Sequence, residues 1–395
     1  MSGKLLFIHD HKFFKTKDGC YYSEGKLPSS AFERFLNIAD SITVLCRSKD
    51  TNDADGLVIS SSDSVGFSPV TGRTWLSIWG RYFFSNIRHV IALIDEADIV
   101  AIRLPCIFSL FVFPILMIKR KPYAVEVVGD AFEAIYNSGG RRASYKFLGW
   151  FFDFYTKIIV SRAVGAIYVT RYKLQEKYKG GEMVSYASNV SIGRVCESVI
   201  SDRENHIRSM VKNEKFKVGV IGSFSNNYKG IDVLIEAVSI CRKSSLLDID
   251  LHVLGSGEVT VLKPAIEKFS AQNWIFFDGR KKSEEVALWL DALDLYCQPS
   301  RTEGLPRALI EAMSRGCPAI ATTVGGIPEL LPESRLVESG DSAALAAKIS
   351  ELLIEPDLMV ADSYKNFEVA KQYYSDALEE RRKQFWEGVA ISCGS

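Results

Sequence analysis

The sequence lacks any excess of charge and any hydrophobic run long enough to cross a membrane. Its 48 basic side chains equal its 48 acidic ones, so bulk charge gives no argument for nucleic acid as a partner. The longest apolar stretch, Ile107 to Ile118, has 12 residues and contains Pro114, which is too short to span a bilayer. No signal peptide precedes the first apolar run. These absences predict a cytoplasmic protein with at most peripheral membrane contact.

Sequence motifs for a metal-binding finger and for a nucleotide phosphate-binding loop are also missing. The eight cysteines are scattered with no Cys-x-x-Cys pair and no metal-finger spacing. Several, such as Cys46, lie in apolar runs, which indicates buried free thiols. His9 and His11 stand at the end of a predicted strand without a third ligand close in sequence, so a loop role is expected and not a metal site. A dinucleotide-binding loop would need Gly-x-Gly-x-x-Gly, but Gly255-Ser256-Gly257 is followed by threonine at position 260, where the third glycine would stand. The Walker phosphate-binding loop is also absent. Hydride transfer and ATP hydrolysis are therefore excluded.

Short β-rich segments alternate with longer helical patterns along the whole chain, which is typical of parallel α/β folds. The predicted fold class is α/β with two doubly wound domains. A polar stretch around residues 198–215 has no β pattern and marks the junction. Residues 1–212 would form the first domain and 213–372 the second, with a charged helix in 373–395. Predicted strands cover residues 5–8, 42–46, 98–103, 123–128, 166–170, 216–222, 249–254, 274–277, 293–298 and 319–321.

The most informative segment, residues 299–322, reads as strand, loop, helix and strand. Residues 303–305 are expected where the helix begins, with Pro306 in its first turn. Free backbone N–H groups there, helped by the helix dipole, hold phosphate oxygens. If most of the intervening span is helical, Glu303 and Glu311 stand roughly 12 Å apart. One carboxylate could then reach a sugar hydroxyl and the other a ribose, although two glutamates on a helix carry no such meaning alone.

The surrounding motifs give these glutamates a context. Glu303-x7-Glu311 is followed by Ala-Met-x-x-Gly-x-Pro and then by Thr-Val-Gly-Gly-Ile-Pro-Glu at residues 323–329. Tyr-Lys-Gly at residues 228–230 precedes Ile-Asp-Val-Leu-Ile-Glu-Ala. This second half resembles the retaining family 4 (group 1) glycosyltransferases.

The first half matches that family more loosely. Residues 9–11, 25–28 and 125–130 are similar to members that act on bacterial surface polysaccharides. The resemblance implies a GT-B fold, in which two Rossmann-like domains face a cleft and the last helix returns to the first domain.

The resemblance also implies residue roles in the second domain. Glu303 would hydrogen-bond hydroxyls of the donor sugar, and Glu311 would hold the ribose. The amides of Gly304 and Leu305, ahead of the proline at position 306, would meet the diphosphate. Lys229 would neutralise the departing nucleoside diphosphate, the alternative being a solvated surface lysine.

One position departs from the family pattern. Many members carry arginine directly after the glycine that ends the first strand of this domain, where this chain has Gly222-Ser223. Ser223 can donate only a neutral hydrogen bond to a bound phosphate. Arg280 and Arg307 are therefore further candidates for the missing charge.

Two candidates lie in the first domain. Gly25 precedes a predicted helix, and its loop could let the backbone approach the diphosphate, or it could serve only turn chemistry. Asp130 stands where many relatives carry a histidine facing the donor sugar. It could orient a hydroxyl or accept a proton, or it could cap the next helix with Glu133 three residues on.

A basic and aromatic segment at residues 141–160 allows two interpretations. As a helix it could pack on a sheet, or it could lie at a membrane interface close to a lipid-linked acceptor. Residues 1–212 carry 28 basic and 21 acidic side chains, against 20 and 27 in the remainder, which favours an anionic surface as partner of the first domain. The predicted stripe comprises Phe147, Trp150, Phe151, Phe154 and Ile158, widened by Phe152 and Tyr155.

The implied activity is same-face transfer of a hexosyl group from a UDP- or GDP-linked sugar to a hydroxyl of a glycan. The implied acceptor is linked to undecaprenyl diphosphate, in lipopolysaccharide O-antigen or capsule assembly on the cytoplasmic face of the inner membrane. No cofactor or metal is implied, because Lys229 and helix amides can neutralise the leaving group. Two alternatives stay open: a nucleotide-sugar 2-epimerase, and a non-catalytic subunit that only binds nucleotide or glycan.

Overall fold

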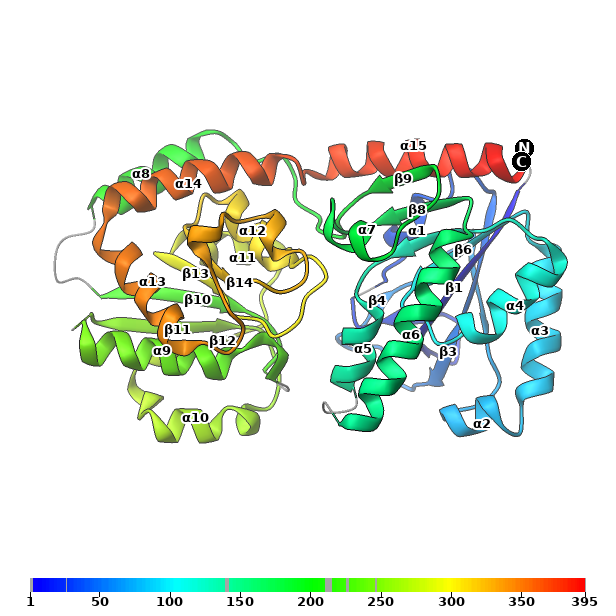
Figure 1. Cartoon of the computed structure of the whole chain (residues 1–395), viewed down its shortest axis with the longest axis horizontal. Helices are drawn as coiled ribbons and strands as arrows, with labels where there is room; N and C mark the ends of the chain where they lie inside the picture. Colours follow the sequence, from blue (N-terminus) through cyan, green and yellow to red (C-terminus); the bar gives the residue numbers. More distant parts are fainter. Residues whose placement is uncertain are drawn as a thin grey trace. The chain divides into compact units, whose positions relative to one another are not determined.

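The computed structural model describes residues 3–25, 27–138, 142–209, 215–224, 227–245 and 247–394. The chain forms two compact α/β units (Figure 1). Unit 1 comprises Met1–Ala187 together with Glu379–Ser395, and unit 2 comprises Ser188–Leu378.

Unit 1 is built on one sheet, whose strands in the described residues number nine and run mostly parallel. The main path is β4-β2-β1-β6-β7-β8-β9, and β3 pairs with β1 and with β5. Every residue of β6 is buried, as expected for an apolar strand covered on both faces. The strands are β1 (Lys4–Lys15), β2 (Tyr21–Ser23), β3 (Ser41–Asp50), β4 (Val58–Ile59), β5 (Val65–Pro69), β6 (Ile99–Leu104), β7 (Ala124–Val127), β8 (Gly165–Tyr168) and β9 (Met183–Tyr186).

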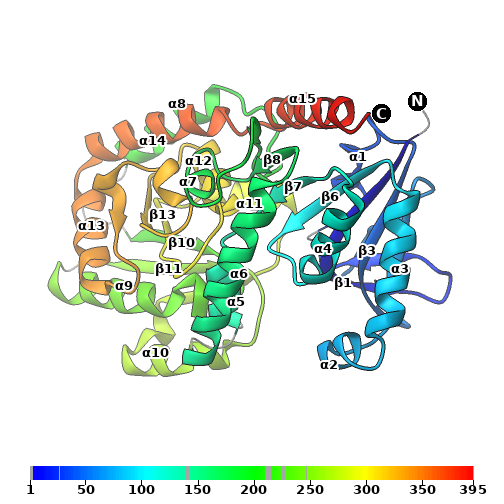
Figure 2. The ribbon, with the colours of Figure 1, turned by 45° about the vertical axis from the view of Figure 1, so that its right-hand side comes forward.

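Helices surround this sheet, and the last one comes from the far end of the sequence. Trp386 on that helix is fully buried, and its ring lies 4.8 Å from the ring of Phe35. The helix lies beside the sheet of unit 1 in both views (Figures 1 and 2). The helices are α1 (Ser30–Glu33), α2 (Trp75–Trp79), α3 (Phe83–Glu96), α4 (Ser109–Lys119), α5 (Ala131–Ser138), α6 (Ala143–Ser161), α7 (Lys173–Lys177) and α15 (Ser375–Cys393).

Helix α6 packs through a different face from its aromatic stripe. Its buried residues are Gly149, Phe152, Asp153, Thr156, Ile159 and Val160. Phe147, Trp150 and Phe154 of the predicted stripe are 73%, 61% and 63% exposed. These three rings therefore do not pack on the sheet, whereas Phe152, which was predicted to widen the stripe, is buried. Among the described residues, no helix is both long and apolar enough to cross a membrane.

Unit 2 has a fully parallel sheet in the order β12-β11-β10-β13-β14-β15. The chain moves outward from β10 to β12 and then returns to the other side of β10, so the strand order reverses between β10 and β13. Ligands of such sheets bind at this point, outside the carboxyl ends of the strands. The strands are β10 (Phe216–Ile221), β11 (Ile249–Leu254), β12 (Ile275–Gly279), β13 (Leu295–Gln298), β14 (Ala319–Thr322) and β15 (Leu336–Val337).

The helices of unit 2 begin earlier in the sequence than residue 213, where the second domain was expected to start. Helix α8 belongs to this unit because Ile207 lies in its core and the buried Arg203 donates through Nη2 to the carbonyl oxygen of Leu290 at 2.8 Å. The α-helices are α8 (Ser198–Ser209), α9 (Ile231–Ser244), α10 (Lys263–Lys268), α11 (Ser283–Asp291), α12 (Arg307–Ser314), α13 (Ser342–Ile354) and α14 (Pro356–Lys371). Single 3-10 turns are η1 (Asn227–Lys229), η2 (Val259–Val261), η3 (Ala271–Asn273), η4 (Ile327–Glu329) and η5 (Glu333–Arg335).

Candidate active site

Three of the predicted residues meet in unit 2 where the strand order reverses. Lys229, on η1, donates from Nζ to Glu303 Oε1 at 2.6 Å. Its side chain lies across Gly222, because a Cβ added at Gly222 would be 2.7 Å from Lys229 Cγ. Gly222 follows β10 and Glu303 follows β13. Lys229 is thus an ion-paired, half-buried lysine at the edge of the sheet, unlike a freely solvated one.

A chain of hydrogen bonds orients the Glu303 carboxylate. Gln298 Nε2 and Ser300 Oγ donate to its Oε1 at 3.1 and 2.8 Å, and Tyr296 donates to Gln298 Oε1 at 2.7 Å. Burial raises the pKa of Tyr296 well above its usual value, with Glu311 and Glu303 adding to the effect, so the phenol stays a donor. Within the described chain no donor contacts Glu303 Oε2, which leaves one oxygen available for a ligand hydroxyl.

The loop between β13 and α12 differs from the prediction. Helix α12 begins at Arg307, and Pro306 has extended backbone angles and caps the helix, so residues 303–305 precede the helix rather than begin it. The estimate of roughly 12 Å between the two glutamates does not apply, because the first part of that span is not helical. Within the described residues the N–H groups of Gly304 and Leu305 make no hydrogen bond. They remain available to phosphate oxygens together with the first-turn amides of α12.

Glycines of the segment at residues 323–329 hold this loop. Gly325 has φ of 57°, and a Cβ there would lie 1.9 Å from the carbonyl oxygen of Glu303. Gly326 donates its N–H to the carbonyl oxygen of Gly304 at 2.6 Å. Gly325 allows a backbone approach that any side chain would prevent.

Glu311 is half-buried on α12. Burial raises the pKa of its carboxyl above the ordinary value, while Arg307 opposes the shift. Arg307 itself is exposed.

Among the other candidates for a contact with the diphosphate, Arg280 is also exposed, and its Nε donates to Ser256 Oγ at 2.8 Å. Ser223 follows the strand glycine directly and is exposed.

An Arg–Asp clamp, which sequence analysis missed, joins the two segments that carry the ion pair. Arg301 Nη1 and Nη2 donate to Asp232 Oδ1 and Oδ2, each at 2.7 Å. The Arg301 N–H donates to the carbonyl oxygen of Tyr228 at 2.7 Å. The loop before Glu303 is thereby fastened to η1 and to the first turn of α9. The two residues are 69 positions apart, and neither carries a local signal of the other.

In unit 1, Asp130 occupies the capping position at the start of α5. Its Oδ1 accepts the N–H of Glu133 at 3.1 Å, and its Oδ2 pairs with Lys177 Nζ at 2.6 Å. Burial opposes the charge of Lys177, but hydrogen bonds to Asp130 and Asp153 outweigh it and raise the pKa of the lysine. Gly25 has φ of 84°, a conformation that favours glycine. The cap geometry is therefore present. For Asp130 to take part in the reaction, a ligand must contact its carboxylate in addition to Lys177.

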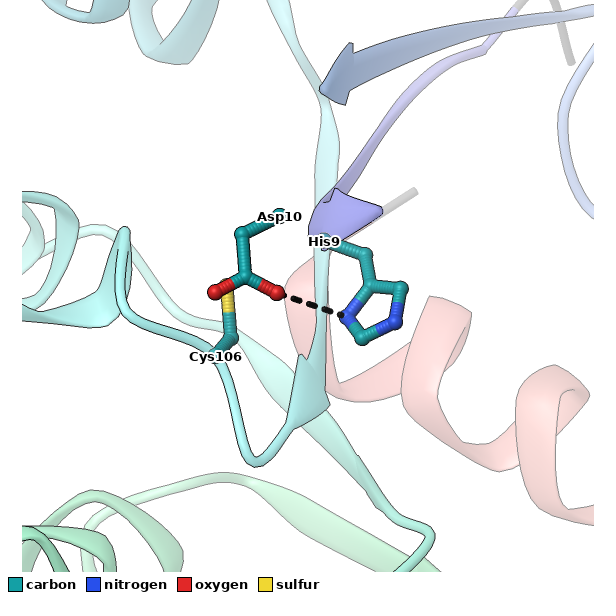
Figure 3. Close-up of side chains that lie close together, drawn as sticks. All are labelled: His9, Asp10 and Cys106. Carbon is teal, nitrogen blue, oxygen red and sulfur yellow. Dashed lines mark ion pairs between the residues drawn. The ribbon is translucent and has the colours of Figure 1, made fainter. Parts of the chain in front are cut away.

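His9 and Asp10, at the irregularity in the middle of β1, form a cluster with Cys106, which follows β6 (Figure 3). Their ligand-type atoms lie within 4.8 Å of one another, a proximity that the sequence spacing did not predict. His9 Nδ1 lies 3.1 Å from the carbonyl oxygen of Arg103, and Asp10 Oδ2 accepts the N–H of Ile107 at 2.7 Å. Burial and the nearby Arg103 lower the pKa of His9 well below its usual value. These atoms already serve the turn after β6, and the positive surroundings disfavour a cation.

Known proteins with similar sequences match both units. Residues 215–355 match the family described as glycosyl transferases group 1. Protein CapJ of Staphylococcus aureus is 29% identical over 386 residues, covering 96% of this chain and 94% of CapJ. The amylovoran biosynthesis glycosyltransferase AmsK of Erwinia amylovora is 34% identical over 134 residues, which cover 31% of this chain and 33% of AmsK.

The solved structures that match include Anabaena Alr3699/HepE in complex with UDP-glucose. That match has a TM-score of 0.63 at 18% identity and covers 98% of this chain and all of the other. This structural match shows the fold. The family match covers the domain that contains the Glu303 and Lys229 motifs. The chain has the GT-B fold, and its residues 215–355 match the family of group 1 glycosyl transferases.

Proposed function

We propose that the protein is a retaining hexosyltransferase that takes its sugar from a UDP- or GDP-linked donor. The observation that carries the proposal is the Lys229–Glu303 pair at 2.6 Å, at the point of the sheet where nucleotides bind in doubly wound folds. The family match over residues 215–355 and the likeness to a structure holding UDP-glucose support it.

In the proposed reaction the bond between the sugar C1 and the donor phosphate oxygen breaks. A new bond from C1 to the acceptor hydroxyl oxygen forms on the same face, and the acceptor proton passes to the departing phosphate. Glu303 Oε2 binds a donor hydroxyl, and Lys229 turns from Glu303 toward the phosphate. The N–H groups of Gly304 and Leu305 direct the positive ends of their dipoles at the departing phosphate. The proposal therefore needs no metal ion or cofactor to stabilise its charge.

The remaining candidates have supporting roles in this proposal. Glu311 holds the ribose. Burial raises the pKa of its carboxyl, and a hydrogen bond donated by a ribose hydroxyl would favour the ionised form. Gly222 leaves room for Lys229. In unit 1, Gly25 and Asp130 are candidates for contacts with the sugars.

We assign the acceptor to the lipid-linked glycans of surface polysaccharide assembly. The similarity to AmsK, named for amylovoran biosynthesis, supports this. The exposed aromatic face of α6 supports contact with a membrane surface, because aromatic side chains beside lysine favour the interface. The proposed location is the cytoplasmic face of the inner membrane.

The experiment is a panel of nucleotide sugars incubated with the protein and a lipid-linked oligosaccharide, with released nucleoside diphosphate and product anomer measured. A retaining transferase gives an α product from an α donor, and Glu303→Gln suppresses it. A sugar epimerised at C2, either free or still linked to the nucleotide, with no glycosylated product would support the epimerase. Nucleotide binding with neither release nor epimerisation of any donor would support a non-catalytic subunit.

Lys229→Ala tests the phosphate contact in the same protein. It should weaken nucleoside diphosphate binding far more than nucleoside binding, and Ser223→Arg should partly restore the loss. Lys243→Ala is the matched control, because Lys243 is an exposed lysine on α9. Equal losses for diphosphate and nucleoside would contradict a phosphate role for Lys229.

A further inference from the structure

Unit 1 contains a basic pocket where three parallel strands end. The pocket has a volume of about 470 Å³ and lies beside the second half of β1, the end of β3 and the loop that follows β5. Ligands of parallel sheets bind outside the carboxyl ends of the strands. The charged side chains that line it are Lys12, Lys49 and Arg73, with Asp50 as the acid.

The loop that brings Arg73 to the pocket is fixed before any ligand binds. Asn86 is buried, accepts the N–H of Thr71 at 2.8 Å and donates to the Thr71 carbonyl oxygen at 3.0 Å. Gly72 has φ of 122°, and a Cβ there would lie 2.8 Å from Ser77 Oγ. Neither the backbone angle nor the space allows another residue at position 72. A preorganised loop loses little entropy when a ligand binds.

The three cations have little internal compensation. Among the described residues, none of Lys12, Lys49 and Arg73 forms an ion pair, and Lys12 lies over the ring of Phe14 at 5.4 Å. One carboxylate, that of Asp50, faces three positive groups. A set of unpaired cations in a concave site attracts a multiply charged anion.

An exposed apolar side chain follows the pocket residues in the sequence. Leu76, on α2 and three residues after Arg73, is 86% exposed. An anion with an apolar chain matches this combination of cationic side chains and a neighbouring exposed leucine.

We propose that the pocket binds a diphosphate group, and that this group is the one that links the acceptor glycan to its lipid. The second part rests on the function proposed above, whereas the first part does not. Oxygens of the diphosphate accept hydrogen bonds from the two lysines and the arginine, and the lipid contacts the exposed Leu76 of α2.

Binding of inorganic diphosphate tests the first part without any turnover. Calorimetry is done on the full chain carrying Lys229→Ala, so that the donor site contributes little. Lys49→Ala, Lys12→Ala or Arg73→Ala should each weaken binding roughly two- to fivefold, as expected for exposed charged groups. Lys49→Arg should preserve it. Lys17→Ala, an exposed lysine after β1 that does not line the pocket, is the control.

Unchanged affinity in all three alanine variants, or an equal loss in Lys17→Ala, would overturn the site. Thermal unfolding of each variant separates loss of binding from loss of fold. If the pocket variants lose diphosphate affinity while the full panel of nucleotide sugars gives no transfer, the pocket stands and the proposed function fails.

The source of the diphosphate is tested with a short prenyl diphosphate and with vesicles of phosphatidylglycerol. The prenyl diphosphate should bind more tightly than inorganic diphosphate, and Leu76→Ser should remove that difference. Lys49→Ala should weaken prenyl diphosphate binding much more than vesicle binding. An equal effect on both would mean that the pocket senses the charge of the membrane surface, which would refute the acceptor assignment.

Discussion

Replacing Asp232 with Asn should loosen the turn that carries Lys229 while leaving unit 2 folded. The carboxylate makes two hydrogen bonds of 2.7 Å to Arg301, and the two side chains are 26% and 23% exposed. Screening at this exposure reduces a charged pair to about 1 kcal/mol. Asp232 also stands in the first turn of α9, where a negative charge contributes about 0.3–1 kcal/mol. We therefore expect a loss of about 1–2 kcal/mol in unfolding free energy, or roughly 2–8 °C in Tm.

The functional consequence is measured by a double-mutant cycle. Asp232→Asn, Arg301→Met and the double variant are compared by thermal unfolding and by calorimetry with UDP and GDP. Each single variant should weaken nucleoside diphosphate binding about three- to tenfold, and the double variant should add little, because the two side chains act as one clamp. Asp248→Asn, which removes the Arg242 pair elsewhere in unit 2, should leave nucleotide affinity unchanged. Additive losses, or reduced stability with unchanged affinity in all three variants, would refute a positioning role.

Four further predictions follow from the contacts of the site and of α6. Glu303→Gln should reduce transfer at least about tenfold while the chain stays folded; a wild-type rate on an assigned donor would remove Glu303 from the site. Gly222→Ala should displace Lys229, whose Cγ would lie 2.7 Å from the new methyl group, and weaken diphosphate but not nucleoside binding in calorimetry. Because burial raises the pKa of Glu311 above its ordinary 4.5, the native chain binds this proton more tightly than the unfolded chain. Stability from this group is lost as pH rises from about 4.5 through the raised pKa. Glu311→Gln should therefore gain unfolding free energy relative to wild type across that window; a constant difference would contradict the argument. Trp150→Ala should reduce sedimentation with anionic vesicles without changing diphosphate binding, and equal sedimentation would exclude this face.

The site could be predicted where its signals are local in sequence. Gly222, Lys229 and Glu303 each follow a recognisable strand or precede a recognisable helix, and the carboxyl ends of parallel strands meet at one edge. The clamp of Arg301 and Asp232 could not be predicted in this way. Each residue on its own fits an exposed loop or a helix start, and only the folded sheet brings the two together.

The limits of the first domain were harder to predict for a related reason. Helix α8 has low hydrophobicity, yet it buries Arg203 against backbone carbonyl groups of unit 2. From the sequence alone, a buried arginine whose N–H groups donate to carbonyl oxygens cannot be distinguished from a solvated arginine. Likewise β1 continues through the polar residues 9–12 to Lys15 because it pairs with β2 and β3 there, although its first apolar run ends at Ile8.

The sequence of unit 2 lies between the two segments that form unit 1, and this order has a consequence for biosynthesis. Trp386 and Phe385 fill the core of unit 1, yet they leave the ribosome after all of Ser188–Leu378. At roughly 5–20 residues per second, the first segment waits about 10–40 s for its missing helix, while the sequence of unit 2 is contiguous and available to fold. We expect nascent chains that stop before residue 379 to contain a protease-resistant second unit and a protease-sensitive first one. Chaperones that bind exposed apolar surface would then be recruited mainly by the half of the protein that is synthesised first.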